Sequence, residues 1–274
     1  MRMVNANGNG AVGVLDKIGQ RTGGLILDCF IDAILWEEAI DTLLQWSRER
    51  QSRYVSICNV HSVVTAKQNP AFRRVINEGD MATPDGMPLV WVLRSIGFQW
   101  QERINGPDLM WRLCGQAAEK GLSIFLYGST SETLERLTNT LRIAFPQLTI
   151  AGVHSPPFRL LSDEEEQEMT DRLNSSGAHI VFVGLGCPKQ EFWMAAHRGK
   201  VRAVMIGVGA AFDYHAGTVK RAPLWMQQSG LEWLFRLVCE PKRLWKRYLV
   251  TNSLFLTYLG FELFGAKRNA SSKC

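Results

Sequence analysis

The feature that most constrains the fold is an alternation of short apolar runs with longer amphipathic stretches. Six runs read as strands: Gly24 to Leu27, Tyr54 to Cys58, Leu122 to Tyr127, Leu148 to Val153, His179 to Gly184 and Ala203 to Val208. The helix-like stretches between them include Trp36 to Arg50, Asp108 to Lys120, Ser131 to Phe145 and Asp163 to Asn174. Strands separated by helices favour parallel pairing through crossover connections. We therefore expect an α/β fold with a doubly wound, mostly parallel sheet.

The same pattern divides the chain into four parts. Residues 1–22, rich in Asn and Gly at the start, are expected to be a flexible N-terminus, and residues 23–221 an α/β core. From Ala222 the pattern changes to helices with interleaved tryptophans and basic residues, which predicts a helical appendage over 222–265. Residues 266–274 are expected to be a flexible tail.

The composition excludes several classes of protein. Apolar residues make up 46% of the 274 and charged residues 21%, which is normal for a folded globular chain. The six cysteines form no Cys-x-x-Cys pair, which argues for thiols in a reducing compartment rather than a disulfide frame or a zinc site. The N-terminus has no apolar signal-peptide core, and no segment reaches the roughly 20 apolar residues that span a bilayer. We expect a cytoplasmic protein.

The glycine turn after the fifth run is the first candidate site. It reads Gly184-Leu-Gly186-Cys-Pro-Lys-Gln-Glu191 and precedes a helical stretch. Free N–H groups at a helix start favour a phosphate or diphosphate, although an ordinary strand-to-helix connection would also have these glycines. Three consecutive polar side chains at the helix start favour the phosphate-binding interpretation over an ordinary connection. They are Lys189, Gln190 and Glu191. Because Lys189 stands where a third glycine would be, the dinucleotide fingerprint is not supported.

Other polar residues follow the strand runs near their expected carboxyl ends. Asn59 and His61 follow Cys58, while Thr83-Pro84-Asp85-Gly86 follows the run ending at Ala82. A carboxylate in the crevice beyond such strands could accept a proton from a sugar hydroxyl, but Asp85 could equally be a helix N-cap. His61 is the competing base, and its alternative role is a structural hydrogen bond.

Two further loops carry candidate ligand contacts. Arg103, in Arg-Ile-Asn-Gly-Pro-Asp108, could bind a phosphate or carboxylate with two hydrogen bonds, or could be an ordinary surface arginine. Asp213 ends Gly207-Val-Gly-Ala-Ala-Phe-Asp213 and is a candidate for ribose hydroxyls. There is no P-loop, no Asp-x-Asp and no His/Cys cluster with ligand spacing, so neither an ATPase nor a bound metal is predicted.

The appendage combines aromatic and basic residues. Between positions 236 and 247 there are five basic residues and one acid, Glu240, in a chain whose net charge is +5. The basic residues are Arg236, Lys242, Arg243, Lys246 and Arg247. Such helices suit an anionic membrane surface, although the tryptophans could instead pack on the core. One short basic cluster without a recognition module argues against nucleic-acid binding.

Taken together, five ordered motifs resemble the WecG/TagA/CpsF glycosyltransferases, family 26, from about Leu25 to Leu263. They are Thr83–Gly86, Arg103–Asp108, Gly184–Glu191, Gly207–Asp213 and Glu240–Tyr248. The resemblance implies a Rossmann-like fold and an inverting, metal-independent transfer from a UDP-sugar to a sugar on a polyprenyl diphosphate, at the cytoplasmic membrane face. It implies no cofactor and leaves self-association into a homo-oligomer open.

The resemblance also implies roles for particular positions. Asp85 matches the catalytic base, Asn59 a pocket residue, and Arg103 an acceptor-side or phosphate-side contact. Gln190 matches the nucleotide-sugar pocket, and the matched arginines near the diphosphate are Arg236, Arg243 and Arg247. Ile57 stands where some members have threonine. The alternatives are a nucleotide-dependent oxidoreductase or epimerase and a non-catalytic membrane scaffold.

Overall fold

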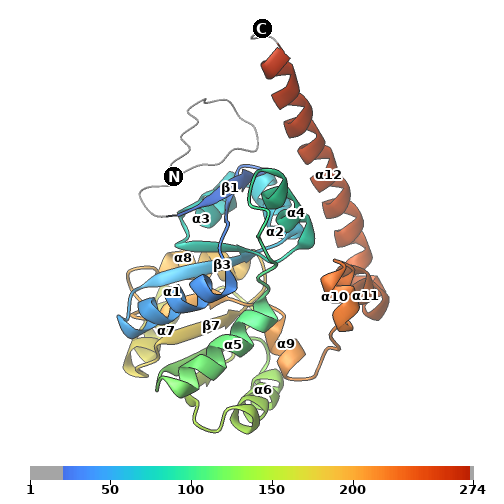
Figure 1. Ribbon diagram of the computed structural model, residues 1–274. Coiled ribbons are helices and arrows are strands. Elements are labelled where there is room, and N and C mark those ends of the chain that lie inside the picture. Colours follow the sequence, from blue (N-terminus) through green and yellow to red (C-terminus); the bar gives the residue numbers. More distant parts are fainter. Residues whose placement is uncertain (1–20, 272–274) are drawn as a thin grey trace.

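A six-stranded parallel sheet forms the centre of the molecule in the computed structural model, which describes residues 21–271 of the chain (Figure 1). The strands are β3 (Arg53–Cys58), β4 (Met81–Pro84), β5 (Ser123–Gly128), β6 (Thr149–His154), β7 (Ile180–Gly184) and β8 (Val204–Gly207). Their order across the sheet is β4-β3-β8-β7-β5-β6, and every neighbouring pair is parallel. The parallel α/β architecture is therefore confirmed.

Alternate residues of each strand point to opposite faces, and a separate apolar core lies on each face. On one face, Ile124, Phe182 and Ile206 pack against α1 (Trp36–Arg48), α5 (Gly106–Glu119), α6 (Ser131–Ala144) and α9 (Ala211–His215). On the other face, Val183 and Met205 pack against α7 (Asp163–Ser175) and α8 (Lys189–His197). Strands buried on both sides explain why the sequence shows continuous apolar runs.

A third apolar cluster forms at the β4 edge. It contains α2 (Val60–Gln68), α3 (Pro70–Glu78) and α4 (Met87–Ser95), together with the hairpin of β1 (Gly23–Ile26) and β2 (Cys29–Asp32). The run from Gly24 is thus a strand, as expected, but it pairs antiparallel with β2 in a small sheet of its own. Leu27 and Asp28, with φ of 51° and 64°, make the tight turn between them.

The predicted helical appendage consists of α10 (Leu224–Gln228), α11 (Glu232–Cys239) and α12 (Pro241–Ser271). Figure 1 shows α10 and α11 beside the core, with α12 running along its side next to α2. Leu244 and Phe255 are buried, and Phe255 belongs to the third cluster. Helix α12 continues into the stretch expected as a tail, whereas residues 1–20 and 272–274 lie outside the described residues.

The carboxyl ends of four neighbouring strands bring the predicted motifs to one edge of the sheet. Asn59 follows β3, Asp85 follows β4, and the turn from Gly184 ends β7 beside the end of β8. The backbone N–H of Asp85 donates to the carbonyl of Cys58 at 2.8 Å, and that of Gly209 donates to Val183 at 3.2 Å. This edge is where open α/β sheets bind ligands.

Candidate active site

Asp85 lies just after β4 and is paired with Arg103 from the loop before α5. Both Nε and Nη2 of Arg103 donate to Oδ1 of Asp85, at 3.1 and 2.9 Å, and Nε also donates to the carbonyl oxygen of Asp85. The loop is fixed because Ile104 N–H donates to Pro84 at 3.0 Å and the buried hydroxyl of Thr83 donates to the Ile104 carbonyl at 3.2 Å. Oδ2 of Asp85 has no protein partner among residues 21–271.

The appendage reaches this pair through Glu232, in the first turn of α11. Its Oε2 lies 2.7 Å from Nη2 of Arg103, and its Oε1 lies 3.9 Å from Nε of Arg221. Arg221 in turn makes two contacts with Asp108, at 2.5 and 3.0 Å. Burial alone would lower the pKa of Arg103, but the charges of Asp85 and Glu232 raise it overall, so the guanidinium stays protonated.

Asn59 and His61 lie at the start of α2, beside the first turns of α12. Asn59 is the N-cap: its Oδ1 accepts from Ser62 N–H at 3.2 Å, in a capping box. Burial, and secondarily the charge of Arg247, lower the pKa of His61, so its ring is neutral at pH 7. Nδ1 of His61 and Nε of Arg247 are buried without hydrogen-bond partners among the described residues.

Several hydrogen-bonding groups of the glycine turn after β7 are already paired within the protein. Gly186, with φ of 80°, donates its N–H to Oε1 of Gln190 at 3.2 Å. The Gln190 amide donates to Glu191 at 2.9 Å and to the Gly207 carbonyl at 3.1 Å. At Gly184 a Cβ would lie 2.7 Å from the Phe212 ring, so only glycine fits. The buried Gln190 therefore joins the ends of β7 and β8, and Pro188 precedes α8 as its N-cap.

Glu191 is a buried carboxyl directly behind this turn. Desolvation raises its pKa from 4.5 to about 7, although hydrogen bonds from Gln190, its own backbone N–H and Cys187 oppose that rise. Lys189, two residues before Glu191 at the start of α8, is exposed. The first turn of α8 thus carries a cation at the surface and a buried acid that is close to its protonation midpoint at neutral pH.

Tyr214 and Arg236 form the third side of the site. The guanidinium of Arg236, from α11, lies 5.6 Å from the centre of the Tyr214 ring. Burial raises the pKa of Tyr214, while Arg236 partly offsets this effect. The Tyr214 hydroxyl and Nε of Arg236 are both buried without hydrogen-bond partners in residues 21–271. Asp213 precedes Tyr214 in the first turn of α9, and Arg243 lies near the start of α12.

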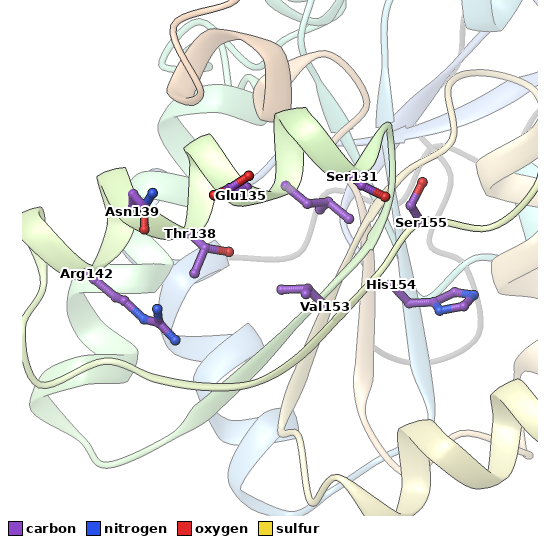
Figure 2. A pocket seen from close by; sticks show the side chains of 9 residues that line it. Ser131, Glu135, Thr138, Asn139, Arg142, Val153, His154 and Ser155 are labelled. Atoms are coloured by element: carbon purple, nitrogen blue, oxygen red, sulfur yellow. The ribbon is translucent and has the colours of Figure 1, made fainter.

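A surface pocket occurs elsewhere, at the opposite edge of the sheet (Figure 2). Its lining comes from α6 and the end of β6: Ser131, Leu134, Glu135, Thr138, Asn139, Arg142, Val153, His154 and Ser155. None of the predicted site residues contributes to it. We place the candidate site at the β4-β3-β8-β7 end, because charged and unpartnered buried groups gather there. Within residues 21–271, no three His, Cys, Asp or Glu side chains form a set that could hold a metal ion.

Comparison with known proteins identifies the family of the chain. The model of the glycosyl transferase WecG/TagA/CpsF family matches residues 25–269. The chain belongs to this family. It is also 30% identical over 239 residues to an N-acetylglucosaminyldiphosphoundecaprenol N-acetyl-beta-D-mannosaminyltransferase of Bacillus spizizenii, across 87% of this chain and 91% of the relative. Membership of the WecG/TagA/CpsF family makes the chain a glycosyltransferase and removes the case for an oxidoreductase, an epimerase or a scaffold.

Sequence reasoning overlooked three residues of the candidate site. Glu232 connects the appendage to Arg103 and Arg221 of the core, Arg221 contacts Asp108, and the guanidinium of Arg236 lies over the ring of Tyr214. Glu232 stands between apolar residues and resembles an ordinary first-turn helix acid. Of the three, only Tyr214 has a signal in the sequence, because it directly follows the candidate Asp213.

None of the helices described between residues 21 and 271 combines the length and apolar character that crossing a membrane requires.

Proposed function

We propose that the chain transfers N-acetylmannosamine from its UDP conjugate to N-acetylglucosamine on a polyprenyl diphosphate, with inversion at the anomeric carbon. The observation that carries the proposal is Asp85, whose Oδ1 is held by Arg103 while Oδ2 has no protein partner. The acceptor and donor sugars are taken from the printed activity of the Bacillus spizizenii relative. The UDP part of the donor follows from the family resemblance of the motifs.

In the proposed reaction Asp85 acts as general base. Its free oxygen accepts the proton of an acceptor hydroxyl while that hydroxyl oxygen attacks the anomeric carbon. The bond between this carbon and the diphosphate oxygen breaks on the opposite face, and UDP leaves with the electron pair. Inversion follows from this single displacement.

The negative charge of the leaving UDP would be met by arginines of the appendage. Nε of Arg236 and Nε of Arg247 are buried without partners among residues 21–271, an arrangement that folded proteins rarely tolerate. A diphosphate would supply the missing acceptors. Lys189 at the start of α8 and Arg243 add positive charge, Asn59 and His61 border the same space, and Asp213 would contact the ribose. No bound metal is needed in this scheme.

We further propose that the appendage rests on an anionic membrane surface at the cytoplasmic side. Leu224 is 72% exposed and Val238 73% exposed, and Trp225 and Trp245 are also largely exposed. The exposed Trp91 of α4 adjoins these helices, because a Cβ at Gly230 would lie 3.6 Å from its ring. Aromatic side chains beside basic ones suit a lipid headgroup layer, and this position would bring Asp85 close to a lipid-linked acceptor.

A transfer assay tests this function. Purified full-length protein is given UDP-N-acetylmannosamine, UDP-glucose or UDP-N-acetylmannosaminuronic acid with an N-acetylglucosaminyl diphosphate lipid, in excess EDTA. We expect transfer from the first donor and an inverted product by NMR. Transfer only from another donor would reject the assigned sugar, and activity that requires added Mg²⁺ or Mn²⁺ would reject the metal-independent scheme.

A further inference from the structure

The strongest unassigned feature is an acidic side chain of the appendage placed inside the catalytic ion-pair network. Glu232 is 8% exposed, although it is the first residue of a surface helix. It faces two arginines of the core side, Arg103 at 2.7 Å and Arg221 at 3.9 Å. Buried carboxylates need such partners, so this contact joins the appendage to the core by charge as well as by apolar packing.

The geometry around Arg103 shows what Glu232 does to Asp85. An arginine facing one carboxylate alone tends to bind both of its oxygens with two parallel hydrogen bonds. Here Nη2 of Arg103 lies between Oδ1 of Asp85, at 2.9 Å, and Oε2 of Glu232, at 2.7 Å. Nε is bound to Oδ1 and to the Asp85 carbonyl. The guanidinium is therefore committed to a single side-chain oxygen of Asp85, and Oδ2 is left for another partner.

We propose that Glu232 is a positioning residue that makes the base competent only while α11 is docked on the core. The inference rests on the proposed function and adds to it a device that couples the appendage to catalysis. With α11 displaced, Arg103 loses its second carboxylate and can close on both oxygens of Asp85. An enzyme whose acceptor lies in a membrane gains from this arrangement, because the base is set only when the appendage is in place.

The second arginine supports a docking role over a purely local one. Arg221 donates two hydrogen bonds to Asp108 and a third, from Nη2, to Oδ1 of Asn105 at 3.2 Å, at the cap of α5. Hydrogen bonds from Arg221 and Asn105 and the nearby arginine charges lower the pKa of Asp108 despite its burial, so the carboxylate stays charged. Glu232 thus enters a site whose two arginines are already fixed by the core.

A double-mutant cycle in the full-length protein tests the proposal. The four proteins are wild type, Glu232→Gln, Arg103→Ala and the double variant, with Glu102→Gln as a control that removes an exposed acid beside Arg103. We expect Glu232→Gln to lower kcat on the order of 10²-fold with the donor KM unchanged, the size of effect that misplacement of a reacting group gives. In the Arg103→Ala background the same change should have almost no further effect.

Melting temperatures of the same four proteins give a readout that needs no substrate. If Glu232 acts through Arg103, the decrease caused by Glu232→Gln should be much smaller when Arg103 is already absent. Equal decreases in both backgrounds, or an equal loss of kcat in both, overturn the proposal. If the wild type transfers no sugar, the proposed function fails and the catalytic assignment of Glu232 falls with it. If the wild type is active and the coupling is zero, only the assignment of Glu232 fails.

Discussion

Arg103 contacts only one of the two carboxylate oxygens of Asp85, which gives the other carboxylate oxygen a chemical role that can be tested. Asp85→Asn keeps the size and the contact to Arg103 but cannot accept the proton of a hydroxyl. We expect turnover to fall by about 10² to 10⁴, the usual contribution of a positioned general base, while UDP binding persists. Steady-state transfer rates and calorimetric titration with UDP measure the two quantities.

The matched control for this substitution is Glu102→Gln, which removes an exposed carboxylate from the same loop. It should leave turnover within about twofold of wild type, as surface substitutions away from special features usually do. Near-normal turnover in Asp85→Asn would remove Asp85 from the mechanism.

Glu191 links the protonation of one buried residue to the stability of the whole chain. Its pKa is raised from 4.5 to about 7, so between these values the folded protein keeps a proton that the unfolded chain releases. The free energy of unfolding therefore falls as pH rises through this window. Above it, the folded protein bears the full free-energy cost of burying an ionised carboxylate. The free energy of unfolding of Glu191→Gln, relative to that of wild type, should therefore increase from pH 5 to pH 8, by up to about 3 kcal/mol. Denaturant unfolding at several pH values measures this difference.

The exposed Glu37→Gln is the control for this pH series. Its free energy of unfolding should stay within about 0.5 kcal/mol of wild type, as for most surface substitutions. A constant difference for Glu191→Gln as well would show that the buried carboxyl does not titrate in this range.

Single residues at strand ends could be predicted, whereas their partners across the fold could not. Asn59, Asp85 and Gln190 each follow an apolar run within a few residues, and the rule that ligands bind beyond parallel strands places them at one edge. Glu232 and Arg221 lie more than 100 positions from the residues that they contact, Arg103 and Asp108. Nothing in their local sequence encodes these contacts, because the docking of α11 determines the position of Glu232 and the path of the chain after α9 determines that of Arg221.

At the scale of elements, α12 is fastened to the core by a small number of buried side chains. Phe255 is 4% exposed and packs in the cluster of the hairpin and α2, whereas its neighbour Leu256 is 69% exposed. We expect Phe255→Ala to reduce the free energy of unfolding by about 3 kcal/mol, the usual loss for a buried phenylalanine. Leu256→Ala should change it by less than about 0.5 kcal/mol. Equal losses measured by denaturant unfolding would contradict the observed packing.

Five of the six sheet strands were predicted because each carries a run of four or more apolar or small residues. The confirmed strands are β3, β5, β6, β7 and β8. Strands β2 and β4 each lack such a run, because β2 ends in an aspartate and β4 in a proline. The run at β1 was read correctly as a strand, but the turn at Leu27 and Asp28 that makes it a hairpin has no glycine to mark it.

At the scale of the whole molecule, the exposed side of the appendage should determine membrane binding. Lys242 and Lys246 are exposed near Trp245. Replacing both by glutamine should weaken binding to anionic vesicles by about 2 kcal/mol, at about 1 kcal/mol for each charge. The wild-type interaction should also fall as salt rises. Flotation with phosphatidylglycerol vesicles at two salt concentrations measures both effects.

Lys200→Gln combined with Arg202→Gln is the control, since these exposed residues lie at the amino-terminal end of β8, away from the appendage. This pair should leave flotation unchanged. If it weakens binding as strongly as the appendage pair, net charge alone explains the interaction.

The contact between α12 and the β1–β2 hairpin has a consequence for how the protein is made. Lys67 of α2 bridges Asp28 of the hairpin, at 2.8 Å, and Glu262 of α12, at 3.5 Å. The cluster that begins at the hairpin is therefore completed by α12, which is synthesised much later. Until then the side chains that Phe255 covers face solvent, and contacts so distant along the chain form slowly. Efficient production should depend on chaperones that shield this surface during translation.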